Sequence, residues 1–289
     1  MTAKTSPSVR PCSVQTEIAI ATQNLTFHYP QQAPILQDVS FSIHQGQRVG
    51  IIGHNGCGKT TLFMLLCGVL SPTAGSIALL QEPVKPGQFR PEIGMLFQDP
   101  DDQLFSPTVR EDIAFGPENM GHSSEAVSRY VESALATTGT QYLAERTPHH
   151  LSGGEKQMVA IASLLAMQPQ VVLYDEPTAS LDMRTRRRLI SFMQRATETM
   201  LISSHDLEFV LDVCDRVLLI DEGQIIADGD PMEIMGNQAL METHGLEKPH
   251  SLIPHVRPHH RRLQADSQHI KEEASRGPVI NSSRTVKNE

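Results

Sequence analysis

The sequence predicts an α/β protein whose core is a sheet of buried strands, interrupted by a helical insertion. Two observations lead to this prediction. Short apolar runs typical of buried parallel strands recur along the chain, mostly separated by stretches of helical pattern. One of these runs, at residues 49–52, leads into a glycine-rich loop and then an apolar stretch at 62–70, which is the order strand, loop, helix.

The first part of the chain divides into a leader and two strands. Residues 1–17 are polar, and we expect a flexible leader there. Alternating apolar residues then predict strands at 18–29 and 39–43, ahead of the strand, loop and helix. Further buried strands are expected at these short apolar runs: 93–97, 171–174, 200–202 and 217–220.

The helical insertion is expected at about residues 107–167. Residues 107–151 are polar, contain alanines and lack strand-like runs, and an apolar helical stretch follows at 158–167. After residue 246 the apolar periodicity fades into Pro, His, Arg and Ser, so residues 247–289 are expected to form a flexible tail. The chain therefore divides into a leader, one large domain over 18–246, and a tail.

Composition limits the classes of function. A net charge of −9 argues against a general nucleic-acid binder. The four cysteines lack the spacing of a zinc site or a disulfide framework, which fits a reducing cytoplasm. No apolar run reaches the ~20 residues that cross a bilayer, and no signal-peptide core is evident. Any membrane role is therefore expected to depend on a partner.

The glycine-rich loop fits the pattern G-x-x-x-x-G-K-[ST] of phosphate-binding loops. Its glycines allow backbone N–H groups to turn toward a phosphate at the start of a helix. Lys59 supplies a positive charge for the β and γ phosphates of ATP, and the Thr60 hydroxyl is expected to bind Mg²⁺. The alternative is a turn that only caps a helix. Such a turn needs neither Lys59 nor the Thr60 hydroxyl. The candidate nucleotide-binding residues are Gly53, His54, Asn55, Gly56, Cys57, Gly58, Lys59, Thr60 and Thr61.

Two carboxylates end the apolar run at 171–174. Asp175 is expected to hold Mg²⁺ and Glu176 to orient or deprotonate the water that attacks the γ phosphate. The alternative is a strand that simply emerges into solvent before Pro177. The phosphate loop earlier in the same chain favours the catalytic interpretation, because hydrolysis needs both a metal-facing carboxylate and a residue that positions water.

A second candidate anion site lies at Ser152, Gly153 and Gly154, before the apolar helix. Ser152 and Glu155 also satisfy the S-x-x-E capping box, so a helix cap without a ligand remains the alternative. The order and separation of the phosphate loop, the Leu-Ser-Gly-Gly-Glu stretch and the acidic strand end resemble those of ATP-binding cassette (ABC) ATPases over residues 18–246.

The resemblance implies an ABC ATPase fold: a P-loop NTPase with a mixed sheet core, an antiparallel β subdomain and a helical signature subdomain. It also implies roles for single residues. Gln98 is similar to the glutamine that senses Mg²⁺ and the attacking water, and His205 to the switch histidine. Asp182 lies in a segment that resembles the loop joining two ATP sites, and Tyr29 resembles the aromatic that stacks on adenine. For Tyr29, core packing or surface exposure remains the alternative.

The family resemblance implies partners as well. Two cassettes, as a homodimer or a heterodimer, are expected to hold ATP between the loop of one and the serine-capped helix of the other. Residues 96–117 resemble the energy-coupling-factor ATPases of cobalt and nickel importers. That resemblance implies a transmembrane coupling subunit, a substrate-capture membrane subunit, and a place at the cytoplasmic face of the membrane. No nucleic-acid partner is expected.

The alternatives are an ATPase of a vitamin or other micronutrient importer, a non-transport ABC ATPase, and a P-loop scaffold without turnover. Glu176 and His205 argue against the scaffold. The sequence departs from the family pattern at Glu155 and Met158, where the negative charge and the missing arginine are expected to weaken the composite ATP site. A run of arginines is expected to form the solvated face of a helix: Arg186, Arg187 and Arg188. Five tail histidines could bind nickel or cobalt, but their irregular spacing favours a solvated tail with incidental histidines: His250, His255, His259, His260 and His269.

Overall fold

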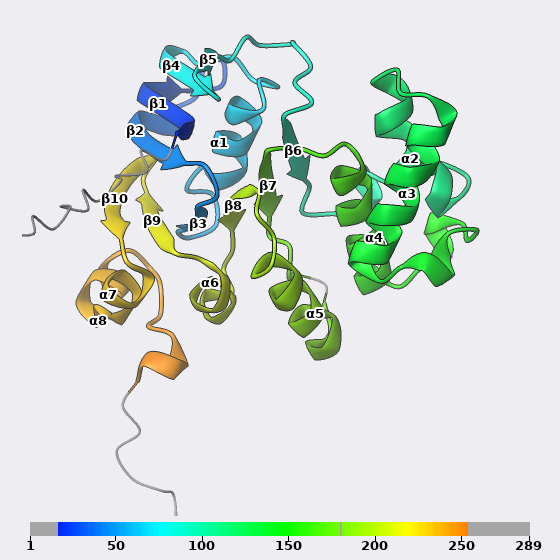
Figure 1. The fold of residues 1–289 in the computed structure, drawn as a ribbon. Coiled ribbons are helices and arrows are strands. Elements are labelled where there is room, and N and C mark those ends of the chain that lie inside the picture. Colours follow the sequence, from blue (N-terminus) through cyan, green and yellow to red (C-terminus); the bar gives the residue numbers. More distant parts are fainter. Residues whose placement is uncertain (1–16, 180, 254–289) are drawn as a thin grey trace, which may run out of the picture. The chain divides into compact units, whose positions relative to one another are not determined.

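Two sheets form the framework of the computed structural model, which describes residues 17–179 and 181–253 (Figure 1). The smaller sheet has the order β2-β1-β4-β5, and its neighbouring strands are all antiparallel. Residues of β1 and β2 alternate between buried and accessible positions, as expected for a sheet with one face on the core. Its strands are β1 (Ile18–Phe27), β2 (Leu36–His44), β4 (Ala74–Leu79) and β5 (Glu82–Pro83).

The larger sheet has the order β10-β9-β3-β8-β7-β6, and only the β10–β9 pair is antiparallel. Every residue of β6, β7 and β8 is buried, which explains the continuous apolar runs in the sequence. Because the five parallel strands point the same way, the segments that follow them meet at one edge. The strands are β3 (Arg48–Ile52), β6 (Ile93–Leu96), β7 (Val171–Asp175), β8 (Thr199–Ser203), β9 (Arg216–Asp221) and β10 (Gln224–Gly229).

Helices α2, α3 and α4 pack against one another in a helical region beside the larger sheet (Figure 1). Side-chain caps begin all three: Thr108, Ser123 and Ser152 each accept a bond from a backbone N–H of the first turn. Gly139 ends α3 in the left-handed conformation that suits glycine. These helices are α2 (Val109–Asn119), α3 (Ser124–Thr138) and α4 (Gly153–Ala166).

The other helices follow the strands of the larger sheet. Helix α1 (Lys59–Leu66) comes after β3. Helices α5 (Met183–Met193) and α6 (Leu207–Val213) come after β7 and β8. Helices α7 (Pro231–Gly236) and α8 (Gln238–Thr243) follow β10 and lie side by side in Figure 1. No described helix is long and apolar enough to span a bilayer.

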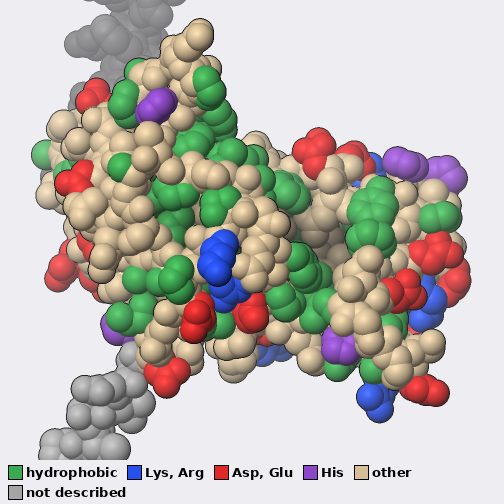
Figure 2. Space-filling view, turned by 90° about the horizontal axis from the view of Figure 1, so that it is seen from above, with side chains coloured by type: hydrophobic (Ala, Val, Ile, Leu, Met, Phe, Trp, Pro, Cys, Tyr) green, Lys and Arg blue, Asp and Glu red, His purple; other side chains and the backbone are tan. Residues whose placement is uncertain are grey.

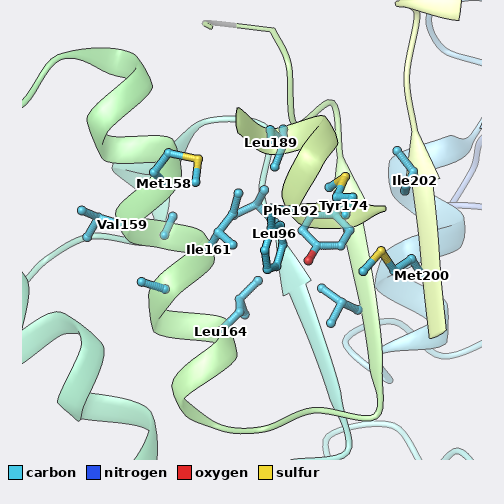
Figure 3. Close-up of a cluster of buried hydrophobic side chains, with 14 of the residues drawn as sticks. Leu96, Met158, Val159, Ile161, Leu164, Tyr174, Leu189, Phe192, Met200 and Ile202 are labelled. Atoms are coloured by element: carbon cyan, nitrogen blue, oxygen red, sulfur yellow. The ribbon is translucent and has the colours of Figure 1, made fainter. Parts of the chain in front are cut away.

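The larger sheet separates two hydrophobic clusters. Along β7, Val172 and Tyr174 belong to one cluster, whereas Val171 and Leu173 belong to the other. The first cluster continues into the helical region, where side chains of α4 face β7 and β8 (Figure 3). The second joins α1 to the smaller sheet. Strand β7 thus contributes side chains to both clusters. Its carboxyl end lies at the edge of the sheet where the parallel strands end.

The predicted α/β fold class is confirmed, but two details differ from the sequence expectations. Strands β4, β5 and β10 were not predicted, because their residues are mostly exposed or half-buried and give no continuous apolar run. The expected solvated arginine face is wrong for Arg186. Its guanidinium is bonded to Asp206 at 2.7 and 3.2 Å and lies over the ring of Phe209.

Candidate active site

The phosphate loop connects β3 to α1 and passes directly against β9. A Cβ atom on Gly53 would lie 2.2 Å from the carbonyl oxygen of Ile220, so only glycine fits there. The Lys59 side chain is buried, and its Nζ donates to the carbonyl oxygens of Gly53 at 2.8 Å and His54 at 3.1 Å. The loop is thereby wrapped around its own ammonium group, which concentrates positive charge at the start of α1.

Asp175 links the loop to the ends of two central strands. The Thr60 hydroxyl donates to Asp175 Oδ2 at 2.6 Å, and the Ser203 hydroxyl donates to Asp175 Oδ1. The carboxylate is buried, with 2% of the residue surface exposed. The structure therefore brings together Thr60 and Asp175, two of the three residues expected at the Mg²⁺ site; Gln98 makes no hydrogen bond with them.

Glu176 is held in a left-handed backbone conformation, with φ of 48°. Its N–H donates to the carbonyl oxygen of Ser203 at 3.1 Å and lies 3.2 Å from the Ser203 hydroxyl. Its carboxylate is bonded to two atoms of His205: the backbone N–H at 3.1 Å and the ring Nδ1 at 2.7 Å. The Glu176 side chain is buried, whereas that of His205 is 63% exposed. The exposed His205 side chain thus contacts the buried carboxylate of Glu176 from the protein surface.

The donor set suits a magnesium ion. A carboxylate and a hydroxyl are hard oxygen ligands, and Mg²⁺ binds through one or two protein groups together with phosphates and water. Within the described residues no cluster of three or more His, Cys, Asp or Glu could hold a metal. Thr60 and Asp175 therefore fit an ion that arrives with a phosphate ligand better than a resident metal cage.

Gln98 and Tyr29 take no part in the contacts described above. Gln98 is exposed two residues after β6 and makes no side-chain hydrogen bond to the described part of the chain. Tyr29 follows β1 by two residues, is half-buried, and packs edge-on against Phe27 with ring centroids 5.0 Å apart. Packing therefore accounts for the Tyr29 contact that the structure contains, and a role in adenine stacking stays a prediction.

Ser152 forms the complete capping box at the start of α4. Its hydroxyl and backbone N–H both donate to Glu155 Oε2, at 2.8 and 2.9 Å, and the Glu155 N–H lies 3.4 Å from the hydroxyl oxygen. The bond from the Ser152 backbone N–H, aided by the hydroxyl, lowers the pKa of Glu155. Gly153 and Gly154 form the first turn of α4. Figure 1 places α4 with the helical region, apart from the phosphate loop between β3 and α1.

Asp182 caps α5 by accepting from the backbone N–H groups of Arg184 and Thr185, each at 2.8 Å. The Thr185 bond is the main reason that the pKa of Asp182 is lowered. Ser180, which shares the predicted connecting loop, lies outside the described residues, as do the leader to residue 16 and the tail from residue 254. Four of the tail histidines therefore lie outside the described residues: His255, His259, His260 and His269.

Sequence reasoning missed two residues at the site. Ser203 bonds both Asp175 and the backbone of Glu176, and its signal was its place at the end of a predicted buried strand, two residues before His205. Asp221 ends β9 and bonds the phosphate-loop residue His54, with Nε2 and Oδ1 2.9 Å apart. Nothing in the sequence spacing links positions 54 and 221.

Comparisons with known proteins agree with this architecture. The ABC transporter family model matches residues 36–179. An ABC transporter ATP-binding protein of Synechocystis sp. is 58% identical over 234 residues, covering 81% of this chain and 82% of the relative. The chain belongs to the ABC transporter ATP-binding family.

Other relatives of this ABC ATPase carry more specific names. The energy-coupling factor transporter ATP-binding protein EcfA of Methanothermobacter thermautotrophicus is 42% identical over 238 residues, covering 80% of this chain and 76% of the relative. The structure of cbiO1 from Clostridium perfringens, part of the ABC transporter complex cbiONQ, matches with a TM-score of 0.70 and 33% identity. It covers 78% of this chain and 94% of that one.

Family membership establishes the general activity. The chain is an ATP-binding protein and an ATP hydrolase coupled to transport, and ABC ATPases work with transmembrane partners.

The face drawn in Figure 2 carries acidic and basic side chains interspersed, with hydrophobic side chains between them.

Proposed function

We propose that this ABC ATPase energises a membrane importer of the energy-coupling-factor type, for cobalt or nickel ions. The observation that carries the catalytic part is the convergence of Thr60, Asp175, Glu176 and His205 where β3, β7 and β8 end. The importer type is supported by the similarity to EcfA and to cbiO1, and by the sequence of residues 96–117.

The phosphate loop binds the β and γ phosphates of ATP in this proposal. Its backbone N–H groups and the Lys59 ammonium face the anion, which takes over contacts that the lysine makes with Gly53 and His54. Thr60 and Asp175 would hold Mg²⁺, which neutralises phosphate charge when bound.

Glu176 orients the attacking water and accepts its proton as the water oxygen bonds to the γ phosphorus and ADP leaves. His205 acts through its contact with the carboxylate: the Nδ1 atom and the backbone N–H both hold Oε2. Ser203 fixes the backbone of Glu176. Gln98, exposed after β6, would help to hold Mg²⁺ and the attacking water.

A second cassette completes the site. Ser152, Gly153 and Gly154 of one copy would face the γ phosphate held by the loop of the other, and Asp182 would lie at the junction. The capping box already commits the Ser152 hydroxyl and N–H to Glu155, so the nucleotide competes with that carboxylate. This competition supports a composite site weaker than one with a neutral residue at position 155.

An exposed aromatic pair offers a docking surface for the transmembrane coupling subunit. Phe105 and Phe115 are 63% and 48% exposed, and their rings meet edge-on with centroids 4.8 Å apart. The pair follows Gln98 along the chain, so a helix packed on these rings could sense the state of the ATP site through residues 98–105. The coupling subunit and the substrate-capture subunit would place this ATPase at the cytoplasmic face of the membrane.

The catalytic assignment is tested by Glu176→Gln. We expect this variant to bind ATP and to lose about 10² to 10⁴ in turnover, the range for a positioned acid or base. The measurement is phosphate release, with ATP binding followed by calorimetry. Glu82→Gln, the same chemical change at an exposed position in β5, serves as the control and should leave turnover unchanged. Normal hydrolysis by the Glu176 variant would reject its role.

The importer assignment is tested by purifying the chain from membranes with its bound partners. We expect a transmembrane coupling subunit, and cobalt or nickel uptake that depends on Glu176. Uptake of a vitamin instead would favour the micronutrient alternative. Recovery of only non-membrane partners would favour a non-transport ABC ATPase and reject the importer.

A further inference from the structure

The phosphate-loop residue His54 has an acceptor at both ring nitrogens. Its Nδ1 lies 2.7 Å from the carbonyl oxygen of Asn55, and its Nε2 lies 2.9 Å from Asp221 Oδ1. A carbonyl or carboxylate oxygen can only accept, and a neutral imidazole carries a single N–H. Both contacts are satisfied together only when each nitrogen carries a proton, that is, when His54 is an imidazolium.

Asp221 is fixed between two histidines at the end of β9. Its Oδ2 accepts from Nδ1 of His244 at 2.6 Å, and its Oδ1 also accepts from the backbone N–H of Glu222 at 2.9 Å. The His244 bond is the main cause that lowers the pKa of Asp221, so this group is a carboxylate. His244 is the C-cap of α8, and Asp221 therefore connects the phosphate loop to the helices that follow β10.

Within residues 17–179 and 181–253, the titratable groups in contact with His54 or with its partner Asp221 come from three parts of the fold. Lys59 donates to the His54 carbonyl oxygen from the start of α1, and Cys57 lies in the same loop, where burial raises the pKa of its thiol and keeps it neutral. From the β9 turn come Asp221 and Glu222, and from α8 comes His244. Asp221 is the carboxylate bonded to the His54 ring, so it is the group that compensates a charge there.

We propose that Asp221 is a positioning residue that holds His54 as an imidazolium on the phosphate loop, and that ATP binding by this chain is therefore proton-linked. The inference rests on the proposed placement of the ATP phosphates on this loop. A protonated His54 adds a second positive charge close to Lys59, and its bond to Asn55 fixes the loop backbone. Loss of the proton removes that charge and one of the two bonds, so ATP affinity falls as pH rises.

The proposal is tested by isothermal titration calorimetry of ATP binding to the full chain, with magnesium chelated to prevent turnover. Titrations between pH 6.5 and 8.5 give the affinity, and paired titrations in HEPES and Tris at pH 7.5 give the protons taken up. His54→Gln keeps a polar side chain that does not titrate. Subtracting its values removes the titration of ATP itself, which is common to both proteins.

We expect the wild-type affinity to fall about three- to fivefold relative to His54→Gln across this pH range, the effect of one partly exposed charge. Wild type should also take up a fraction of a proton more. Asp221→Asn should lose most of this difference. His244→Asn, whose amide can replace the Nδ1 donor, should retain more of it than His244→Ala. His122→Gln, which changes an exposed histidine between α2 and α3, should behave as wild type.

Equal pH dependence and equal proton uptake in wild type and His54→Gln would overturn the proposal. The wild-type proton count needs no variant to fold, so an unstable Asp221→Asn protein leaves the proposal falsifiable. Absence of ATP binding by wild type at every pH would instead reject the placement of phosphates on the loop, which is a different failure.

Discussion

At the scale of single residues, one carboxylate serves both the fold and the candidate composite site. Glu155 closes the capping box of α4 and also accepts from the Tyr142 hydroxyl at 3.2 Å. Because its pKa is lowered in the folded chain, its contribution to stability is present above the ordinary glutamate pKa. That contribution is lost as pH falls through the lowered value. At neutral pH the full negative charge therefore stands beside Ser152.

Replacing Glu155 by Gln should separate these two roles. Glutamine also completes a capping box, so the free energy of unfolding should fall only by the small contribution that the charge of the Glu155 carboxylate makes. Removing the charge should strengthen ATP-induced association of two chains about two- to threefold, the size of a surface electrostatic effect. Sedimentation with magnesium and ATP measures the association. Glu125→Gln, in the first turn of α3, makes the same change away from the candidate site. Weaker association in the Glu155 variant would contradict the expectation.

Individual site residues were predictable where a local motif carried them. The loop pattern identified Lys59 and Thr60, and the charged strand end identified Asp175 and Glu176. The contacts among them were only partly predictable, because Thr60 meets Asp175 across 115 positions of sequence. Asp221 reaches His54 across a still longer separation, and only the strand order of the larger sheet brings β9 beside β3.

At the scale of elements, the contact between β3 and α6 depends on Gly50. A Cβ atom at this position would lie 2.7 Å from Cγ1 of Val210 and 3.3 Å from both Cys214 Sγ and Val217 Cγ2. These groups are buried, so they have little space to move. The absent side chain thus lets α6 pack closely on the strand that leads into the phosphate loop.

Gly50→Ala should therefore destabilise the fold by about 1 to 3 kcal/mol, the usual cost of overpacking. Urea unfolding followed by circular dichroism measures the change. Gly236→Ala is the matched control, since a Cβ atom there meets nothing within 4 Å, and it should be neutral or slightly stabilising. A Gly50 variant as stable as wild type would show that α6 can shift without cost.

Elements with strong periodicity were predicted from sequence, and edge elements were not. The buried runs of β7 and β8 favoured strands because they are short and stretches of helical pattern separate them. Strand β10 lies at the edge of its sheet and alternates exposed with half-buried residues, which is a weak signal. Strands β4 and β5 depend on pairing with β1 rather than on their own composition.

At the scale of the whole molecule, the proposed composite site requires a second copy or a related chain. Glu176→Gln with magnesium and ATP should form a dimer, because nucleotide persists between the two cassettes when it is not hydrolysed. The same variant with ADP should stay monomeric. Light scattering after gel filtration distinguishes the two states. A monomer under both conditions would contradict the head-to-tail arrangement.

The position of the larger sheet has a consequence for how the molecule melts. Strands β3, β7, β8 and β9 each contribute side chains to both hydrophobic clusters, so neither cluster can form without the strands that also build the other. If the elements that cover the first cluster unfolded, one face of every central strand would be exposed to water. If the elements that cover the second cluster unfolded, the opposite face would be exposed. Residues 17–253 should therefore denature in one cooperative transition, with near-identical midpoints for probes placed in α3 and in β1.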